Sequence, residues 1–177
     1  RLQEMPVQYA DCSLWQRHEL MPMLGPAKEY WREHLQEGAL PMLELPLDYA
    51  RPAKQTFEGD VVSVVMAVPE VGAQLERVAR SHGATLYQLA LALWCVLLCR
   101  HAGQDEVVVG SPYHGRDAAG TEALIGYFVN VLALRVEVPR GGAGTVLFVV
   151  RGARDAAAGG MRYAALPFQQ IVHELLP

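Results

Sequence analysis

Residues 125–138 read Ile-Gly-Tyr-Phe-Val-Asn-Val-Leu-Ala-Leu-Arg-Val-Glu-Val, and no other segment of the chain is as informative. It is rich in β-branched and aromatic residues, and polar and apolar residues partly alternate after Asn130, as in a half-buried strand. The amide of Asn130 needs hydrogen-bond partners in such a strand, because an unsatisfied buried amide costs about 1–3 kcal/mol. Asn130 is therefore either a structural bridge or part of a functional site.

Strands and helices are predicted to alternate around this stretch, which favours an α/β layer fold. Strands are expected at residues 61–68 and 106–110, the second covered on both faces. Thr85 can cap a helix at 86–100 that is apolar nearly all round, so we expect it to be central and buried, with Trp94 inside the core. Other helices are expected at 25–37, 69–81, 121–124, 145–162 and 168–175, an irregular connection at 39–59, and a polar loop at 111–120.

Composition bounds the class of protein. The 177 residues are 51% hydrophobic and 19% charged, which is typical of a globular domain with a core of its own. The net charge of −4 leaves no basic field for nucleic acid and no Lys/Arg run for an anionic membrane. The longest apolar stretch, residues 86–99, is too short to span a bilayer and indicates a buried helix.

The three cysteines are Cys12, Cys95 and Cys99, an odd count without a disulfide framework. Cys95 and Cys99 share a helix face and could form a metal pair, but two buried thiols in a reducing, cytoplasmic compartment are the simpler interpretation. The chain begins with Arg1 rather than Met and stops at Pro177 just after a helical pattern. We therefore expect it to be a segment of a longer protein.

One histidine stands out as a candidate site residue. His114 lies in a loop directly after a buried strand, beside Gly115 and Arg116, where α/β folds place their chemistry. The other five histidines are interpreted as structural, with His18 and His34 solvated. No metal-ligand spacing, Gly-x-Ser-x-Gly elbow or Walker lysine occurs, and the glycines at residues 141–144 are interpreted as a plain loop.

Five segments, in order, resemble the motifs of a single family. They are Tyr9-Ala-Asp-Cys-Ser-Leu-Trp15-Gln16; Tyr30-Trp31 followed by Leu43-Glu44-Leu45-Pro46-Leu-Asp48; Gly103-Gln-Asp-Glu-Val-Val-Val-Gly110-Ser-Pro112; Ile125-Gly-Tyr-Phe-Val-Asn130; and Leu166-Pro167-Phe168-Gln-Gln-Ile-Val. In this respect the chain resembles the C-terminal half of a condensation domain from a nonribosomal peptide synthetase. The Phe-Val-Asn at residues 128–130 argues against the epimerisation branch.

The resemblance implies an incomplete two-lobe domain of the chloramphenicol-acetyltransferase-like fold, in which each lobe has a mixed sheet with flanking helices. Two carrier domains would insert phosphopantetheine arms into the tunnel between the lobes, and an acceptor amine would attack a donor thioester to form an amide. The family's His-His-x-x-x-Asp-Gly motif is absent, and residues 113–117 do not fit it. We expect this segment to hold no catalytic residue, no metal and no directly bound cofactor, and to be inactive alone.

The expected partners are carrier domains, the missing N-terminal lobe and a neighbouring adenylation domain. The candidate tunnel residues are Asn130, Tyr113, His114, Arg116 and Tyr127. Asn130 is expected to bridge backbone groups of the tunnel wall. Arg116 could pair with a carboxylate or carrier phosphate or be a solvated loop arginine, and Tyr113 and Tyr127 could line the tunnel or pack in the core.

The segment departs from the family pattern at two places. Tyr163-Ala164-Ala165 stands where the family often has His-Gln-Asp, and Cys12-Ser13 replaces an aromatic-Ala pair. These departures suggest an atypical or degenerate parent domain. Two alternative functions are also open: a catalytically silent docking domain for carriers or tailoring enzymes, and a stand-alone acyltransferase of the same fold that uses coenzyme A. Within the partial domain we expect a helix and an irregular connection over residues 1–59 and an α/β lobe over 60–177.

Overall fold

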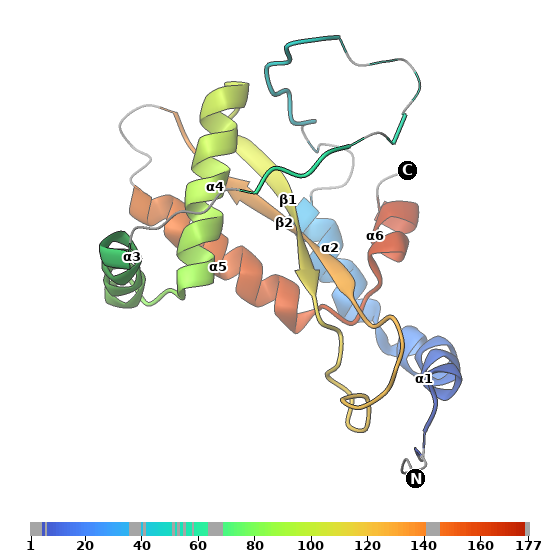
Figure 1. The fold of residues 1–177 in the computed structure, drawn as a ribbon. Coiled ribbons are helices and arrows are strands. Elements are labelled where there is room, and N and C mark those ends of the chain that lie inside the picture. Colours follow the sequence, from blue (N-terminus) through green and yellow to red (C-terminus); the bar gives the residue numbers. More distant parts are fainter. Residues whose placement is uncertain are drawn as a thin grey trace. The chain divides into compact units, whose positions relative to one another are not determined.

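The computed structural model describes residues 5, 7–35, 40, 42–50, 52, 54, 56–57, 59–63, 69–140 and 146–175. Two strands form a small antiparallel sheet, and helices precede and follow them, so the fold is α/β as the sequence predicts (Figure 1). In chain order the elements are α1 (Tyr9–Trp15), η1 (Gln16–Leu20), η2 (Met21–Met23), α2 (Gly25–Leu35), α3 (Pro69–Ser81), α4 (Leu86–Ala102), β1 (Glu106–Tyr113), β2 (Asn130–Glu137), α5 (Val146–Arg162) and α6 (Phe168–Leu175).

The chain divides into two compact units that interleave along the sequence. The first unit comprises Arg1–Pro41, Val108–Val136 and Asp155–Pro177, and the second comprises Met42–Val107 and Glu137–Arg154. Each unit has buried apolar residues of its own, among them Trp31, Leu134 and Ile171 in the first and Leu89, Cys95 and Val150 in the second. The division of the domain into residues 1–59 and 60–177 stays a prediction.

Two adjacent glycines in α5 explain how the core of the first unit packs. A Cβ on Gly159 would lie 2.3 Å from Tyr30 Oη, and a Cβ on Gly160 would lie 2.9 Å from a methyl of Leu134. The indole of Trp31 is fully buried, and its Nε1 donates a hydrogen bond to the carbonyl of Tyr163 at 3.1 Å. The glycines cost helix propensity, about 1 kcal/mol each, and allow aromatic side chains of α2 to lie against the α5 backbone.

Helix α4 organises the second unit together with α3, against which it packs. It begins at a capping box, in which the Thr85 hydroxyl accepts from Gln88 N and the Gln88 side chain accepts from Thr85 N. It ends at Gly103, whose φ of 67° closes the helix in the left-handed conformation. The N-terminus lies where the sequence predicts it, and the C-terminus at Ala102 lies two residues beyond the predicted end at Arg100.

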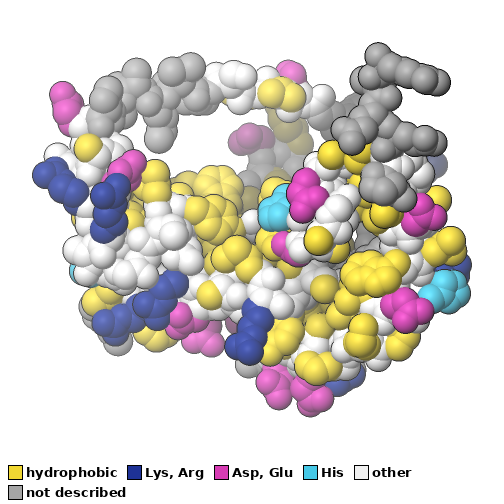
Figure 2. Space-filling model, turned by 90° about the horizontal axis from the view of Figure 1, so that it is seen from below, with side chains coloured by type: hydrophobic (Ala, Val, Ile, Leu, Met, Phe, Trp, Pro, Cys, Tyr) yellow, Lys and Arg dark blue, Asp and Glu magenta, His cyan; other side chains and the backbone are white. Residues whose placement is uncertain are grey.

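The prediction that α4 is buried all round is wrong. Trp94 is 51% exposed, and its neighbours along the same stripe are similarly open: Leu86, Tyr87, Leu93 and Leu97. An apolar helix is buried only where enough chain surrounds it, and the described part of this unit covers one side of α4. On the face drawn in Figure 2, hydrophobic side chains are interspersed with acidic and basic ones.

Three further predictions of local structure need correction. Strand β1 continues through Tyr113 into the predicted loop, and Val107 and Ser111 are its buried positions, so it is not covered on both faces. Strand β2 starts only at Asn130, five residues after the predicted start. The predicted helix at 121–124 is a turn, because the carbonyls of Thr121 and Leu124 accept hydrogen bonds from Arg116 instead of from helical N–H groups. Residues 61–63 are not a strand, and 64–68 lie outside the described residues.

The remaining predicted helices are confirmed to within a few residues. Three predicted features fall largely outside the described residues: the turn at 140–144, the helix cap at 145, and the end of the first helix at 36–38. Among the described residues no single helix is long and apolar enough to cross a membrane; α3 and α4 reach that length and composition only as a pair bent by 100°.

Candidate functional site

A cavity of about 860 Å³ opens in the first unit, and we call it the loop cavity. Three segments line it: residues 7–20 with α1 and η1, the loop that connects β1 to β2, and the link between α5 and α6. Of the five candidate residues from the sequence, Asn130 and Tyr127 line this cavity, whereas Tyr113, His114 and Arg116 do not.

Asn130 is the first residue of β2, and its side chain binds the link between α5 and α6. Its Nδ2 donates to the carbonyls of Ala164 and Leu166, both at 2.8 Å. Its Oδ1 accepts from the backbone N–H of Phe168 at 2.9 Å. One side chain thus satisfies three backbone groups, which fixes the wall segment of the loop cavity. Asn130 has the backbone partners that its place in a strand requires, and its tunnel role stays a prediction.

Arg116 folds the loop between β1 and β2 around its guanidinium. Nη1 donates to the carbonyls of Thr121 and Leu124, the second at 3.0 Å, and Nη2 approaches the carbonyl of Gly126 at 3.5 Å. The guanidinium also lies over the Phe128 ring, 4.2 Å from its centroid. Arg116 is therefore a partly buried residue that is engaged with loop carbonyls rather than a free, solvated loop arginine. Its pairing with a carboxylate or a carrier phosphate stays a prediction.

Tyr9 ties helix α1 to the end of the same loop. Its hydroxyl donates to the carbonyl of Tyr127 at 2.8 Å, and its ring meets Phe128 edge-on with centroids 5.2 Å apart. A Cβ on Gly126 would lie 2.2 Å from the Tyr9 ring, so only glycine fits there. Sequence reasoning placed Tyr9 in a family motif without giving it a role, and this contact supplies one.

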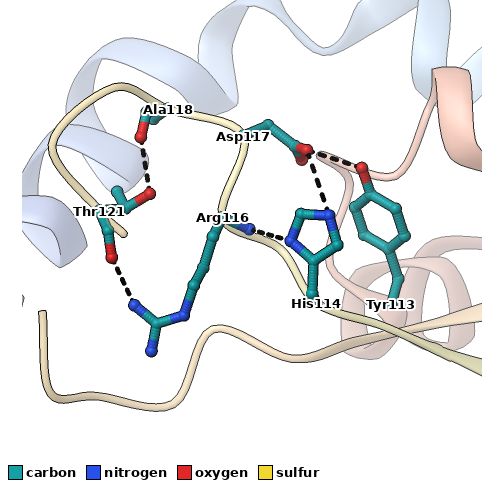
Figure 3. A network of polar contacts seen from close by, with 6 residues as sticks. All are labelled: Tyr113, His114, Arg116, Asp117, Ala118 and Thr121. Carbon is teal, nitrogen blue, oxygen red and sulfur yellow. Dashed lines mark hydrogen bonds and ion pairs between the residues drawn. The ribbon is translucent and has the colours of Figure 1, made fainter. Parts of the chain in front are cut away.

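A polar cluster of Tyr113, His114 and Asp117 lies at the start of the loop (Figure 3). The Tyr113 hydroxyl donates to Asp117 Oδ1 at 2.7 Å, and that bond, more than burial, raises the pKa of Tyr113 to about 12. His114 Nδ1 accepts the backbone N–H of Arg116 at 3.0 Å, while its Nε2 lies 3.9 Å from Asp117 Oδ1. His114 is thereby held against the loop backbone through its Nδ1.

His34 differs from the solvated residue that the sequence predicts. It is half-buried, its ring stacks on Tyr30 with centroids 5.4 Å apart, and its Nε2 accepts the backbone N–H of Arg135 at 3.1 Å. Burial, reinforced by the charge of Arg135, lowers the pKa of His34. A strand N–H therefore finds its acceptor on helix α2, which no spacing rule reveals.

The cysteines differ in exposure. Cys95 and Cys99 are buried, and burial raises the pKa of the Cys95 thiol to about 12. Cys12 is half-buried and lines the loop cavity. Among the residues that the structure describes, no group of three or more histidine, cysteine or acidic side chains is arranged to hold a metal ion.

Comparison with known proteins gives one family over the whole length. The family model described as Condensation domain matches residues 1–176. A component of the linear gramicidin synthase of Brevibacillus parabrevis is 41% identical over 178 residues, which cover 99% of this chain and 2% of that protein. A component of the plipastatin synthase of Bacillus subtilis (strain 168) is 38% identical over 176 residues, covering 99% of this chain and 5% of that protein. The chain therefore spans a small fraction of the curated relatives it matches.

Solved structures agree with this assignment. The teicoplanin-biosynthesis X-domain, from its complex with OxyB, matches with a TM-score of 0.87 at 26% identity, covering 100% of this chain and 40% of that one. The condensation domain of the monacolin K polyketide synthase MokA matches with a TM-score of 0.78 at 25% identity, over 100% of this chain and 42% of that one. Both matches extend over the whole chain and less than half of the neighbour.

Proposed function

Because this chain belongs to the condensation-domain family found in nonribosomal peptide synthetases, we propose that it supplies the second lobe of an amide-forming site. The observation that carries the proposal is the loop cavity, whose wall is held by Asn130, together with a family match over residues 1–176. In the proposed arrangement this lobe forms part of a tunnel wall and faces the acceptor carrier.

The proposed reaction joins two carrier-bound substrates on phosphopantetheine arms. The neutral amine of the acceptor aminoacyl thioester attacks the carbonyl carbon of the donor thioester. The amide C–N bond forms and the C–S bond breaks; the amine nitrogen loses one proton, and the departing thiolate takes one up. The residues of this chain bind and orient the acceptor, and the group that moves the proton lies outside the chain.

The contacts of His114 support the proposal that the proton-transferring group lies outside this chain. A general base must reach the reacting amine with a free lone pair. The Nδ1 lone pair of His114 already accepts a backbone N–H, and His114 does not line the loop cavity. No His-His-x-x-x-Asp-Gly motif occurs in the sequence, so we propose that the chain by itself does not catalyse condensation.

A second function, docking without catalysis, is favoured by one observation. The X-domain of teicoplanin biosynthesis matches with a TM-score of 0.87, and its structure is described as a complex with OxyB. Tyr163-Ala164-Ala165, where the family often has His-Gln-Asp, is a departure that a silent domain would tolerate. In this alternative the lobe binds a carrier or tailoring protein and forms no amide.

One assay separates the two functions. The complete domain containing this chain is mixed with a donor carrier loaded with an acyl group and an acceptor carrier loaded with an amino acid. Intact-protein mass spectrometry then follows the acceptor carrier. A mass increase equal to the donor acyl group supports condensation. Carrier or tailoring-protein binding without any such increase contradicts condensation and supports docking.

A further inference from the structure

Residues 42–50, which we call the strap, carry apolar side chains at every second position from 43 to 49. The strap reads Met-Leu-Glu-Leu-Pro-Leu-Asp-Tyr-Ala, so three leucines and a tyrosine alternate with two acids and a proline. This spacing is typical of an extended segment that keeps one apolar face. The strap belongs to no helix or strand of the structure, and the chain bends at residues 48–49.

The side chain of Gln104 holds the start of the strap as a neighbouring strand would. Its Nε2 donates to the carbonyl of Met42 at 2.9 Å, and its Oε1 accepts the backbone N–H of Glu44 at 3.0 Å. In an extended chain the carbonyl of one residue and the N–H two residues later lie on the same edge, so one amide can bind both. Gln104 is itself fixed, because it lies in the turn between α4 and β1, where Asp105 Oδ1 accepts from Arg140 Nε at 2.6 Å.

The apolar face of the strap is covered at its start and uncovered at its end. Leu43 and Leu45 are half-buried, whereas Leu47 is 52% exposed and Tyr49 is 88% exposed. Removing such side chains from water is favourable, at about 25 cal/mol for each Å² of apolar surface. An apolar face that begins against the protein and continues into solvent indicates a second surface that covers its end.

The length of the related structures indicates where that second surface lies. This chain covers 40% of the X-domain chain and 42% of the MokA condensation-domain chain, although each match extends over all of this chain. A complete domain therefore contains more than enough additional chain to cover the end of the strap. Because Gln104 fixes the start of the strap, Leu47 and Tyr49 reach only a surface that lies beside this unit, as a surface of the same domain does.

We propose that the end of the strap binds the part of the complete domain that lies outside residues 1–177. Leu47 and Tyr49 contact an apolar surface of that part, and Gln104 is the positioning residue that directs the strap toward it. The inference does not rest on amide formation, because a condensing domain and a silent docking domain would need the same contact.

Photo-cross-linking tests the contact directly. Tyr49 is replaced by p-benzoylphenylalanine in the complete domain, which is irradiated and digested, and mass spectrometry identifies the cross-linked peptides. We expect Tyr49 to be joined to peptides of the same domain from outside residues 1–177. The matched control carries the same photo-reactive residue at Met42, which is 78% exposed and lies outside the alternating apolar series, and it should leave those peptides unlabelled.

Variants of Gln104 test its positioning role. Gln104→Leu removes both hydrogen bonds to the strap, which as an exposed pair are worth about tenfold in the docked population, so amide exchange at Glu44 and Leu45 should become about tenfold faster. The cross-link from position 49 should become weaker in the same variant. Gln74→Leu, which changes an exposed glutamine on α3 in the same unit, should alter neither the exchange nor the cross-link.

The outcomes separate the contact from the role of Gln104. Cross-links confined to residues 1–177, cross-links to a carrier or to a second copy of the domain, or no cross-link from position 49 would each overturn the proposed contact. A native exchange rate and a native cross-link yield in Gln104→Leu would overturn the positioning role and leave the contact standing. A domain that forms no amide but gives the expected cross-links would contradict the proposed function and support this inference.

Discussion

Replacing Asn130 with leucine should release the wall of the loop cavity. The substitution keeps the side-chain volume roughly constant and removes three hydrogen bonds, two to the carbonyls of Ala164 and Leu166 and one from the N–H of Phe168. Each is worth about 0.5–1.5 kcal/mol net, and the carbonyls of Ala164 and Leu166 belong to buried residues. The expected loss is therefore about 3 kcal/mol.

Amide hydrogen exchange in the complete domain measures this loss where it occurs. A local loss of about 3 kcal/mol corresponds to about hundredfold faster exchange at the start of α6, at Phe168 and the amides after it. Ser13→Ala is a matched control, because it removes one exposed side-chain hydrogen bond, to the carbonyl of Tyr9, and should leave α6 unchanged. Native-like exchange at Phe168 in Asn130→Leu would show that Asn130 does not hold this wall.

Three other predictions test contacts around the site. Gly126→Ala should destabilise the domain by about 1–3 kcal/mol, because its Cβ would lie 2.2 Å from the Tyr9 ring, whereas Gly25→Ala, with no atom within 4 Å, should not; thermal unfolding decides. Iodoacetamide at pH 8 should label Cys12 and should spare Cys95 until the domain unfolds, because burial raises the pKa of the Cys95 thiol to about 12. Peptide mass spectrometry reports the labelling of each thiol, and labelling of Cys95 in the native domain would contradict its burial. Burial lowers the pKa of His34, so the stability contributed by its neutral form is present above the unfolded pKa of about 6.5 and is lost as pH falls. His34→Gln should therefore flatten the decline in unfolding temperature from pH 8 to pH 5. An unchanged decline in the variant would contradict this role of His34.

Helix positions could be predicted from the sequence because their signals are local. Thr85 and Gly103 mark the ends of α4 through capping chemistry that depends on a few neighbouring residues. The break at Pro167 sets the start of α6 in the same way. The need of Asn130 for hydrogen-bond partners was also predictable, since it follows from one amide within an apolar strand.

The partners of those groups could not be predicted, because they lie far away in the sequence. The carbonyls that Asn130 binds are 34 and 36 residues away, and the backbone N–H that His34 accepts is 101 residues away. Arg116 shows the same limit within a loop: its hold on the carbonyls of Thr121 and Leu124 replaces a predicted helix with a turn. Tertiary contacts overrode local propensity at each of these sites.

The burial of α4 could not be predicted for a different reason. Its composition is apolar on every side, but Trp94 and its stripe are exposed in the described chain. An apolar composition shows that a helix can be buried on every side. It does not show which other segments pack against each side.

A crystal structure of the complete domain, with an aminoacyl phosphopantetheine mimic attached to its acceptor carrier, would test most directly whether the loop cavity receives the acceptor. We expect electron density for the aminoacyl group in the loop cavity, in contact with Tyr127 and with the wall that Asn130 holds. Density for the mimic elsewhere, with the cavity filled by side chains from the rest of the domain, would contradict an acceptor site in this lobe.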